Sequence, residues 1–408
     1  MTTTDPTPSW ADDYDIFDPR YVSDPFPIWD ELRQECPVPH TERWGGSWMP
    51  TRYEDVSAVA HDTDHFSSRE VLVTPPPEYD GGEGEEMMLA LGGDVSAPPI
   101  TSDPPEHQWA RRLILPMFAP KAVEKYEPIT RDLCRSLVEE MLPAGRGDAA
   151  VGYSQQIPVR IIAKMLGIPD SMSDTFTTWV RGALEIGATD PAVRQQAFKE
   201  IITYLFEELG KRKEHPGDDI ISELLAAEVD GEPVPDFHIL GTGMLILIAG
   251  IDTTWSAIGS ALWHLATHPE DRRRLVAEPE IMPLAVEELL RAYSPVTMAR
   301  VVKQDAEVNG CPMKEGERVL LSFPSANRDP EVFERADEVI LDRAKNRHIA
   351  FGAGIHRCAG SNLARMELRV AIEEWLRVVP EFSLEEGREV TWAGGQVRGP
   401  RSLPVVFS

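Results

Sequence analysis

A lone cysteine in a glycine-rich loop near the end of the sequence most strongly limits what this chain can fold into. Residues 351–360 read FGAGIHRCAG, which places Cys358 after His356 and Arg357, and apolar residues at helical spacing follow over 362–375. Glycine lets the backbone pass close to a bulky, flat ligand. A thiol at a helix N-terminus beside cationic side chains is expected to have a lowered pKa, which favours the thiolate that metals bind. The loop predicts a metal-ligating cysteine, and the alternative is a buried structural cysteine.

A long apolar stretch over 239–267 is predicted to be helical and carries a second motif. Its centre, 249–254, reads AGIDTT. Glycine and threonine have lower helix propensity than alanine or leucine, so the helix gives up stability there. This indicates that a ligand uses the groove at this point. The alternative is a core helix with a tolerated glycine and a threonine bonded back to a carbonyl group.

These two motifs resemble the signatures of the cytochrome P450 family, the heme-thiolate monooxygenases. The iron-ligand signature of the family is matched by Phe351, Gly352, Gly354, His356, Cys358 and Gly360. The resemblance implies a mainly α fold with small β-sheets, in which heme b (iron protoporphyrin IX) lies between a long distal helix and a proximal cysteine loop. It also implies that Phe351, His356 and Gly360 contact the cofactor. Cys358 would be the metal ligand, a thiolate that favours O–O cleavage.

The same resemblance implies catalytic roles at the centre of the long helix. Asp252 and Thr253 fall on the acid–alcohol pair of the family. The implied role of Thr253 is to stabilise oxygen activated at the iron, and that of Asp252 is to relay protons to it. Proton transfer of this kind contributes about 10²–10⁴-fold to a rate.

Basic residues at family positions are expected to hold the heme propionates. His107 and Arg111 match a His-x-x-x-Arg motif, Arg300 matches the arginine of a strand at the heme edge, and His356 is the third expected contact. Arginine suits this task because its planar fork binds carboxylates bidentately. The alternative for each residue is a solvated surface position.

Glu288 and Arg291 match the Glu-x-x-Arg helix of the family, which implies a structural role. Residues three apart share a helix face and can pair. The family closes this network with a third, basic residue. Here Glu338 occupies the slot that is usually basic, and Arg343 or Arg335 is expected to substitute.

Family position also implies a substrate pocket. Its expected walls are Leu245, Ile248, Ala249, Val296, Thr297 and Val397, and core packing is the alternative for each. The segment 71–100, with an adaptable Met87–Leu89 cluster, is predicted to form a mobile cover. Because these walls carry no charge, we expect a small, neutral, apolar substrate. Residues 252–264 and 293–302 resemble a bacterial group acting on thiocarbamates and alkyl aryl ethers, which implies hydroxylation or oxidative O-dealkylation of an aromatic compound.

Composition and length agree with one large unit. The 408 residues are 42% hydrophobic, and no linker, repeat or charge block divides them, so we predict a single heme domain over 1–408. Helical periodicity and strand-like runs each recur along the chain. Helices are expected at 120–141, 191–213, 269–277 and 281–292, and short strands at 47–51, 301–302, 308–309, 319–322 and 403–407.

Charge and cysteine usage exclude several classes of protein. A net charge of −28 excludes the basic footprint that nucleic-acid binding needs. Four cysteines without CxxC spacing predict neither a zinc site nor a disulfide framework, which favours a reduced, cytoplasmic setting. The first residues resemble no signal peptide. The longest apolar run, 244–251, is too short to span a bilayer, so no membrane association is expected.

Electrons are expected from another protein, because no flavin or iron–sulfur module follows Ser408. In the family, an acidic ferredoxin-like or flavodoxin-like donor with its NAD(P)H reductase docks on the proximal face. A basic patch is predicted there from Arg111, Arg112, Lys121, Arg357 and Arg365.

Three functions are consistent with the sequence. The favoured one is a monooxygenase that inserts one atom of O₂ into a small-molecule substrate. A heme-thiolate peroxygenase using H₂O₂ is the first alternative, and a non-enzymatic heme protein that binds a gas or another ligand is the second. The intact pair Asp252–Thr253 disfavours both alternatives.

Overall fold

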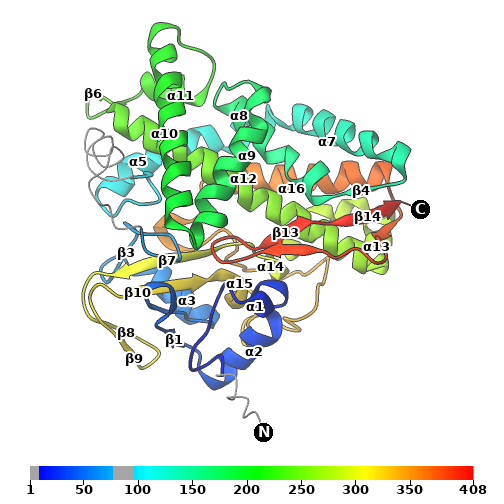
Figure 1. The fold of residues 1–408 in the computed structure, drawn as a ribbon, viewed down its shortest axis with the longest axis horizontal. Helices are drawn as coiled ribbons and strands as arrows, with labels where there is room; N and C mark the ends of the chain where they lie inside the picture. Colours follow the sequence, from blue (N-terminus) through cyan, green and yellow to red (C-terminus); the bar gives the residue numbers. More distant parts are fainter. Residues whose placement is uncertain (1–8, 77–95, 408) are drawn as a thin grey trace.

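Helices form most of the molecule in the computed structural model, which describes residues 9–76 and 96–407 (Figure 1). The α-helices are α1 (Pro19–Ser23), α2 (Phe26–Glu35), α3 (Tyr53–His61), α5 (Glu106–Ile114), α6 (Pro120–Glu124), α7 (Glu127–Met141), α8 (Gln156–Met165), α9 (Ser173–Leu184), α10 (Pro191–Glu214), α11 (Ile220–Leu225), α12 (Asp236–Thr267), α13 (Pro269–Ala277), α14 (Met282–Ala292), α15 (Phe323–Ala326) and α16 (Ser361–Val378). The predicted Met87–Leu89 cluster lies outside the described residues.

Short strands form small sheets. The strands are β1 (His40–Thr41), β2 (Ser47–Trp48), β3 (Phe66–Ser67), β4 (Arg146–Asp148), β5 (Glu228–Val229), β6 (Glu232–Pro233), β7 (Thr297–Val302), β8 (Ala306–Val308), β9 (Cys311–Met313), β10 (Arg318–Ser322), β11 (Phe382–Leu384), β12 (Thr391–Ala393), β13 (Gly399–Ser402) and β14 (Pro404–Phe407). The largest sheet has the order β1-β2-β10-β7-β3, and its antiparallel β7–β10 pair runs from Arg318 opposite Val301 to Ser322 opposite Thr297. A second sheet, β11-β14-β4, and the β12–β13 pair use the last residues of the chain.

The predicted elements are confirmed in kind, with changes at their ends. The helix predicted over 269–277 has the bounds of α13, and the long apolar helix begins three residues earlier than predicted. The helix predicted over 120–141 is instead two helices, α6 and α7, with a break at Lys125–Tyr126. Pro128 accounts for the break. Inside a continuous helix its ring would clash with the preceding turn, whereas in the first turn of α7 its missing N–H costs nothing.

Helix α12 runs through the centre of the helical part of the molecule, with α16 alongside it (Figure 1). By length and composition α12 could cross a membrane, since it has 32 residues, but 67% of its most apolar window is buried inside the protein. It packs against α8, α9, α10 and α16. At Gly250 a Cβ atom would collide with Ile162 of α8. Gly250 therefore lets α12 pack closely on α8, and it also lines the internal cavity.

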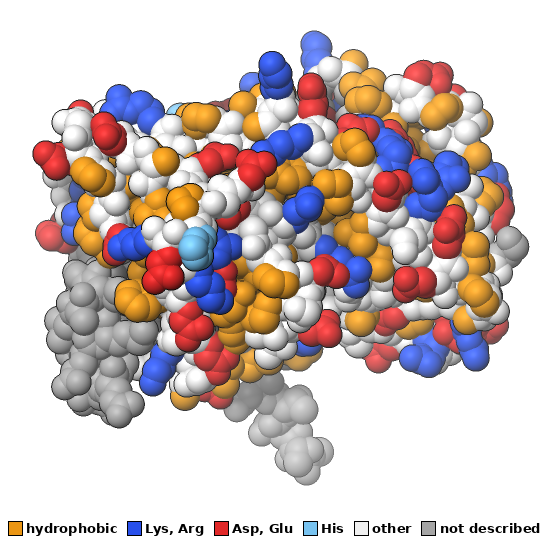
Figure 2. All heavy atoms as spheres, turned by 90° about the horizontal axis from the view of Figure 1, so that it is seen from above, with side chains coloured by type: hydrophobic (Ala, Val, Ile, Leu, Met, Phe, Trp, Pro, Cys, Tyr) orange, Lys and Arg blue, Asp and Glu red, His pale blue; other side chains and the backbone are white. Residues whose placement is uncertain are grey.

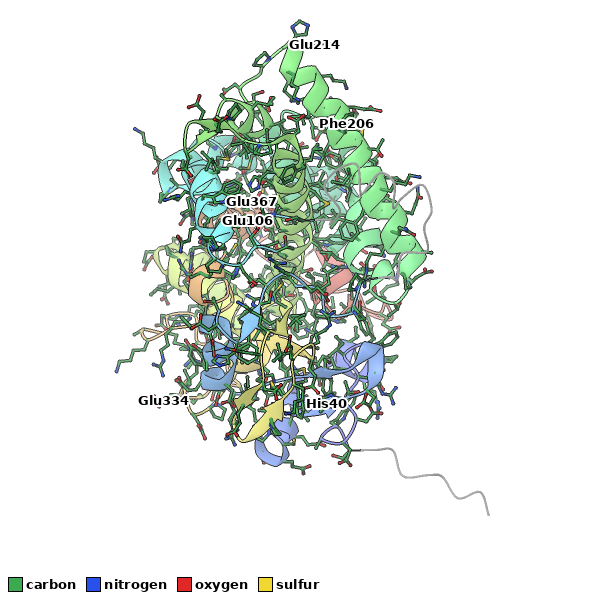
Figure 3. The ribbon with its side chains drawn as sticks, turned by 90° about the vertical axis from the view of Figure 1, so that its left-hand side faces the viewer. His40, Glu106, Phe206, Glu214, Glu334 and Glu367 are labelled. Atoms are coloured by element: carbon green, nitrogen blue, oxygen red, sulfur yellow. The ribbon has the colours of Figure 1, made fainter. Side chains whose placement is uncertain are left out.

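The helical part and the largest sheet lie at opposite ends of the molecule. Figure 3 shows α10 rising at one end, with Glu214 at its tip, and His40 among the strands at the other. Large apolar clusters fill each part: one joins α7, α8, α12 and α16, and another lies between α3 and the largest sheet. On the face in Figure 2, basic and acidic side chains are interspersed rather than segregated, although the chain has a net charge of −28.

Candidate functional site

The cysteine loop is held in a defined shape where it enters α16. Gly352 and Gly354 have φ values of +73° and +65°, which side-chain-bearing residues rarely adopt. At Gly354 a Cβ atom would also collide with the carbonyl oxygen of Ala60 in α3, so only glycine fits there. The Cys358 N–H donates to the Phe351 carbonyl over 2.7 Å and closes the loop. Gly352 and Gly354 therefore allow the cysteine loop its observed shape, as the sequence predicts.

The Cys358 side chain faces an internal cavity rather than bulk solvent. It is exposed to that cavity, and protein surrounds it elsewhere. Burial raises the pKa of its thiol, and the Gly360 N–H and the charges of Arg111, Arg357 and Arg365 only partly oppose this. The expectation of a lowered pKa is therefore wrong for the protein alone, because desolvation outweighs the cations. A bound metal ion deprotonates a coordinating thiol directly, so ligation does not depend on a low pKa beforehand.

The cavity has a volume of about 250 Å³ and lies between the cysteine loop and α12. One wall consists of residues of α12: Leu245, Ile246, Ala249, Gly250, Thr253, Thr254 and Ala257. The opposite wall comes from the cysteine loop and the start of α16, and further residues come from α5 and β7. The two motifs that the sequence places about 100 residues apart thus face each other across one space.

Four basic side chains gather at this cavity, and none of the carboxylates in the described part of the chain lines it with them. Arg111, Arg300 and His356 line it, and the ring of His107 lies 4.3 Å from that of His356. The Nε2 atoms of both histidines are buried and lack a hydrogen-bond partner in the described part of the chain. Burial, with the charges of Arg300, His107 and Arg111, lowers the pKa of His356 to about 2, and burial lowers the pKa of Arg300 to about 10.

These orphaned donors fit the two propionates of heme b. Unpaired buried polar atoms are costly, and an anionic ligand would satisfy them. Arg111 also donates to the Arg357 carbonyl beside Cys358, which joins this basic cluster to the loop. His107, Arg111, Arg300 and His356 would hold the propionates of a bound heme, and Cys358 would be the ligand to its iron. Phe351 and Gly360, which are expected to contact the cofactor, also line the cavity.

Neighbouring residues of α12 face different surroundings. Thr253 lines the cavity, and its Oγ1 donates to the Ala249 carbonyl over 2.8 Å. This bond engages the hydroxyl hydrogen, so the oxygen lone pairs remain free to accept a hydrogen bond. Asp252 is not among the cavity-lining residues; its side chain is 1% exposed and bonded to Arg401 over 2.7 Å. The predicted pair is thus adjacent in sequence, but only Thr253 faces the cavity.

Arg401 is the residue that sequence reasoning missed. The C-terminal segment containing it was noted only for its resemblance to the family. A basic residue far along the chain gives no local signal that it will pair with a carboxylate of a central helix.

Three of the six expected pocket residues lie in the cavity wall: Leu245, Ala249 and Val296. The other three do not. Thr297 is buried, with its N–H bonded to the Gln396 carbonyl, and Val397 is 3% exposed and bridges to Val296. Ile248 packs on the helical core. For these three, core packing replaces the predicted contact with substrate.

The Glu288–Arg291 pair is fully buried, and its third partner is Arg343. Glu288 accepts from Arg291 over 2.8 Å and from Arg343 over 2.9 Å. Arg335, the other candidate, is exposed and pairs with the Glu338 side chain over 3.1 Å. Glu338 still contributes through its backbone carbonyl, which accepts from Arg291 over 2.7 Å. This network fixes the segment before the cysteine loop against α14.

The central helix, the opposed cysteine and the basic cluster define the class of heme-thiolate oxygenases. A family model described as Cytochrome P450 matches residues 191–391. The chain is 33% identical over 386 residues to the mycinamicin IV hydroxylase/epoxidase of Micromonospora griseorubida, covering 92% of this chain and 94% of the relative. It therefore belongs to the cytochrome P450 family and is a P450 monooxygenase that uses heme b.

Other relatives extend over similar lengths. Nocardicin C N-oxygenase of Nocardia uniformis subsp. tsuyamanensis is 33% identical over 416 residues and is covered completely, as is this chain. Among solved structures, cytochrome P450 CREJ in complex with (4-ethylphenyl) dihydrogen phosphate superimposes with a TM-score of 0.86 at 31% identity, over 95% of this chain and 98% of that one. The fold predicted from the two motifs is thereby confirmed.

When bound, thiolate-ligated heme supplies the O₂-activating chemistry of the reaction. The chain's own residues provide the rest. The basic cluster would orient the cofactor by its carboxylates, the apolar walls would exclude water, and the Thr253 oxygen offers a hydrogen-bond acceptor inside a space of low polarity.

Proposed function

We propose that this monooxygenase inserts one atom of O₂ into a small, neutral, apolar substrate, by hydroxylation or oxidative O-dealkylation of an aromatic compound. The composition of the cavity wall carries this proposal. Away from the basic cluster and Cys358, the side chains that line it are apolar except for the hydroxyls of Thr253 and Thr254, and no carboxylate of residues 9–76 and 96–407 lines it. Such a wall favours neutral ligands, because an unpaired charge would be buried without compensation.

The position of the cavity supports a substrate held beside the cofactor. The cavity of about 250 Å³ reaches from the cysteine loop to α12, so substrate and cofactor share it. One structural neighbour, cytochrome P450 CREJ, holds (4-ethylphenyl) dihydrogen phosphate, which supports an aromatic ring in the substrate, although that ligand carries an acidic phosphate group. We further propose that residues 1–408 act as a single heme domain, since the cavity draws on residues from Pro99 to Leu368.

Electrons are proposed to come from a separate ferredoxin or flavodoxin with its NAD(P)H reductase, in the cytoplasm. Arg112, Lys121 and Arg357 are exposed near the cysteine loop and offer a basic docking surface. The predicted patch is smaller than expected, because Arg111 lines the cavity and Arg365 forms a two-pronged ion pair with Glu287. Charge reversal at Arg112 should slow reduction by an acidic donor and weaken its dependence on ionic strength.

An optical titration of the heme-loaded ferric protein tests the substrate class. Small aromatics, aryl ethers, thiocarbamates and terpenes are added in turn, and the low-to-high-spin change is recorded. Aryl ethers or small aromatics should produce the change, and carboxylate analogues of matched size should not. A response to the carboxylates but not to the neutral compounds would overturn the proposal.

Product analysis separates the two reaction types and the peroxygenase alternative. Turnover of an aryl methyl ether with donor, reductase and NADH should release formaldehyde if O-dealkylation occurs and a ring-hydroxylated ether if hydroxylation occurs. Equal turnover with H₂O₂ alone would instead favour the peroxygenase.

A further inference from the structure

The side chain of Gln396 lies at a point where three separate segments meet. It is 4% exposed and belongs to the segment between β12 and β13. Its Oε1 accepts from the Val73 N–H over 2.8 Å. Its Nε2 donates to the Thr297 carbonyl over 2.9 Å and to Met298 Sδ over 3.2 Å. One buried amide group therefore joins the segment that follows β3 to the start of β7.

This amide takes the place of a neighbouring strand beside the first half of β7. On one edge β10 pairs with β7 along most of its length, whereas on the other edge β3 reaches only the last two residues of β7. Beside the first half, the Ala299 N–H donates to the Val71 carbonyl over 2.9 Å, and the Gln396 amide bonds next to it. The side chain thus supplies hydrogen bonds that a backbone peptide group gives in a continuous sheet.

The alternation of the strand turns neighbouring side chains toward the cavity. Successive side chains of a strand point to opposite faces. Val296, Met298 and Arg300 accordingly line the cavity, whereas Thr297 and Ala299 between them are buried and are not among its lining residues. The hydrogen bonds along this edge of β7 therefore fix the position of side chains that face the cavity.

The backbone that carries Gln396 is itself fixed by packing. Gly395 has a φ of +81°, and a Cβ atom there would collide with the Phe17 ring, so only glycine fits. The Thr297 N–H donates to the Gln396 carbonyl over 3.1 Å, which joins the backbones of the two segments as well. The amide group is thus presented to β7 from a turn with a defined shape.

Met298 is the wall residue whose place depends most on such a contact. A methionine side chain has three rotatable bonds and adapts to irregular spaces, so it specifies the shape of a cavity poorly when nothing restrains it. It is the one methionine in the cavity wall that residues 9–76 and 96–407 form. The bond from the Gln396 amide to its sulfur restricts these rotations and favours one rotamer.

We propose that Gln396 is a positioning residue that sets the substrate selectivity of this site, by holding Met298 and the start of β7 against the cavity. The inference rests on the proposed function, in which this cavity receives a small, neutral, apolar substrate. Gln396 is not among the lining residues and acts through those it holds. A fixed Met298 excludes ligands that are a few methylene groups longer, whereas a mobile Met298 moves aside for them.

Gln396→Met tests this inference, because it keeps the length of the side chain and removes the amide. The probes are alkoxybenzenes from methoxybenzene to butoxybenzene, titrated into the heme-loaded ferric protein and followed by the spin-state change. In the wild type the dissociation constants of the longest and shortest ethers should differ by more than about tenfold, and in Gln396→Met this ratio should fall about tenfold. Gln196→Met, the same change on the exposed face of α10, is the control and should leave the ratio unchanged.

A double-mutant cycle with Met298→Leu shows whether Gln396 acts through Met298. Leucine has nearly the volume of methionine and fewer rotamers, and this exchange is well tolerated in protein cores. In the Met298→Leu protein, Gln396→Met should change the ratio less than about twofold, because the flexible side chain that it would release is absent. A tenfold change in both backgrounds would show that Gln396 acts elsewhere and would overturn the inference.

A measurement on the wild-type protein remains decisive if Gln396→Met does not fold. The methyl carbon of Met298 is labelled with carbon-13, identified by its loss in Met298→Leu, and followed by NMR in the reduced, heme-loaded protein under carbon monoxide. A single held rotamer should place its chemical shift away from the rotamer-averaged value of a free methionine. An averaged shift in the wild type would overturn the inference.

The outcomes separate this inference from the proposed function. If no alkoxybenzene changes the spin state of the wild type, the proposed substrate class fails, and 1-alkylimidazoles of increasing length, which bind heme iron through nitrogen, replace the ethers as probes of the same wall. An equal selectivity ratio in wild type and Gln396→Met, with either set of probes, overturns the inference alone. A lower Tm for Gln396→Met with an unchanged ratio would show a purely structural glutamine.

Discussion

Replacing Glu367 by glutamine should stabilise the protein, and more so as the pH rises. Glu367 lies on α16, inside the molecule, as Figure 3 shows. Its side chain is fully buried, and neither carboxyl oxygen has a hydrogen-bond partner within residues 9–76 and 96–407. Burial raises the pKa of this carboxyl to about 8. No cation offsets the burial, unlike at Glu374 on the same helix, which bonds to Arg131.

The sign and size of the effect follow from proton linkage. The unfolded chain releases the Glu367 proton near its ordinary pKa of 4.5, whereas the folded protein keeps it up to about pH 8. Folding therefore takes up a proton between these values, and the free energy of unfolding falls as the pH rises through them. At 1.36 kcal/mol per pKa unit the whole loss is on the order of 5 kcal/mol, of which about 3 kcal/mol is reached by pH 7.

Glu367→Gln removes the titration but keeps the size and polarity of the side chain. We expect the variant to match the wild type near pH 5 and to exceed it by about 3 kcal/mol at pH 7. Chemical denaturation of the heme-loaded protein at pH 5, 6, 7 and 8 measures this difference. Glu373→Gln on the same helix is the control, since Glu373 pairs with Arg131 and Arg369 and its loss should give no gain. A difference between Glu367→Gln and wild type that stays constant over this pH range would refute the reasoning.

Three further predictions concern the site and the buried ion network. Thr253→Ala should lower product per NADH by about 10²-fold and release hydrogen peroxide, because the hydrogen-bond acceptor in the cavity is lost; Thr254→Ala is the control, and unchanged yield would remove the role of Thr253. Cys358→Ala should abolish the strongly red-shifted carbonyl band of the reduced, heme-loaded protein under carbon monoxide, and retention of that band would refute the ligand assignment. Arg343→Ala should destabilise the fold by about 3–5 kcal/mol in thermal or chemical unfolding, because it removes one of the two cations paired with the buried Glu288 carboxylate, whereas the exposed Arg335→Ala should cost less than about 1 kcal/mol.

Local patterns in the sequence were enough to predict most elements. Helix α13 is confirmed at both ends, and α12 and α10 within a few residues, because apolar spacing and an initial proline are properties of neighbouring residues. The loop before Cys358 was predicted for the same reason, since its glycines record the backbone angles that the loop requires. The assigned roles of Asp252 and Thr253 stay predictions until they are measured.

Tertiary structure decided which distant groups meet. Arg343 and Arg335 are equivalent by sequence, yet only Arg343 reaches Glu288. The walls of the cavity and the pKa of Cys358 likewise depend on what surrounds each side chain after folding. Helix α12 and its acid–alcohol pair could be predicted from a short stretch of sequence, but the bond from Arg401 to Asp252 spans 149 residues. Periodicity acts over a few residues, whereas ion pairing and desolvation depend on packing between segments that the chain brings together only when it folds.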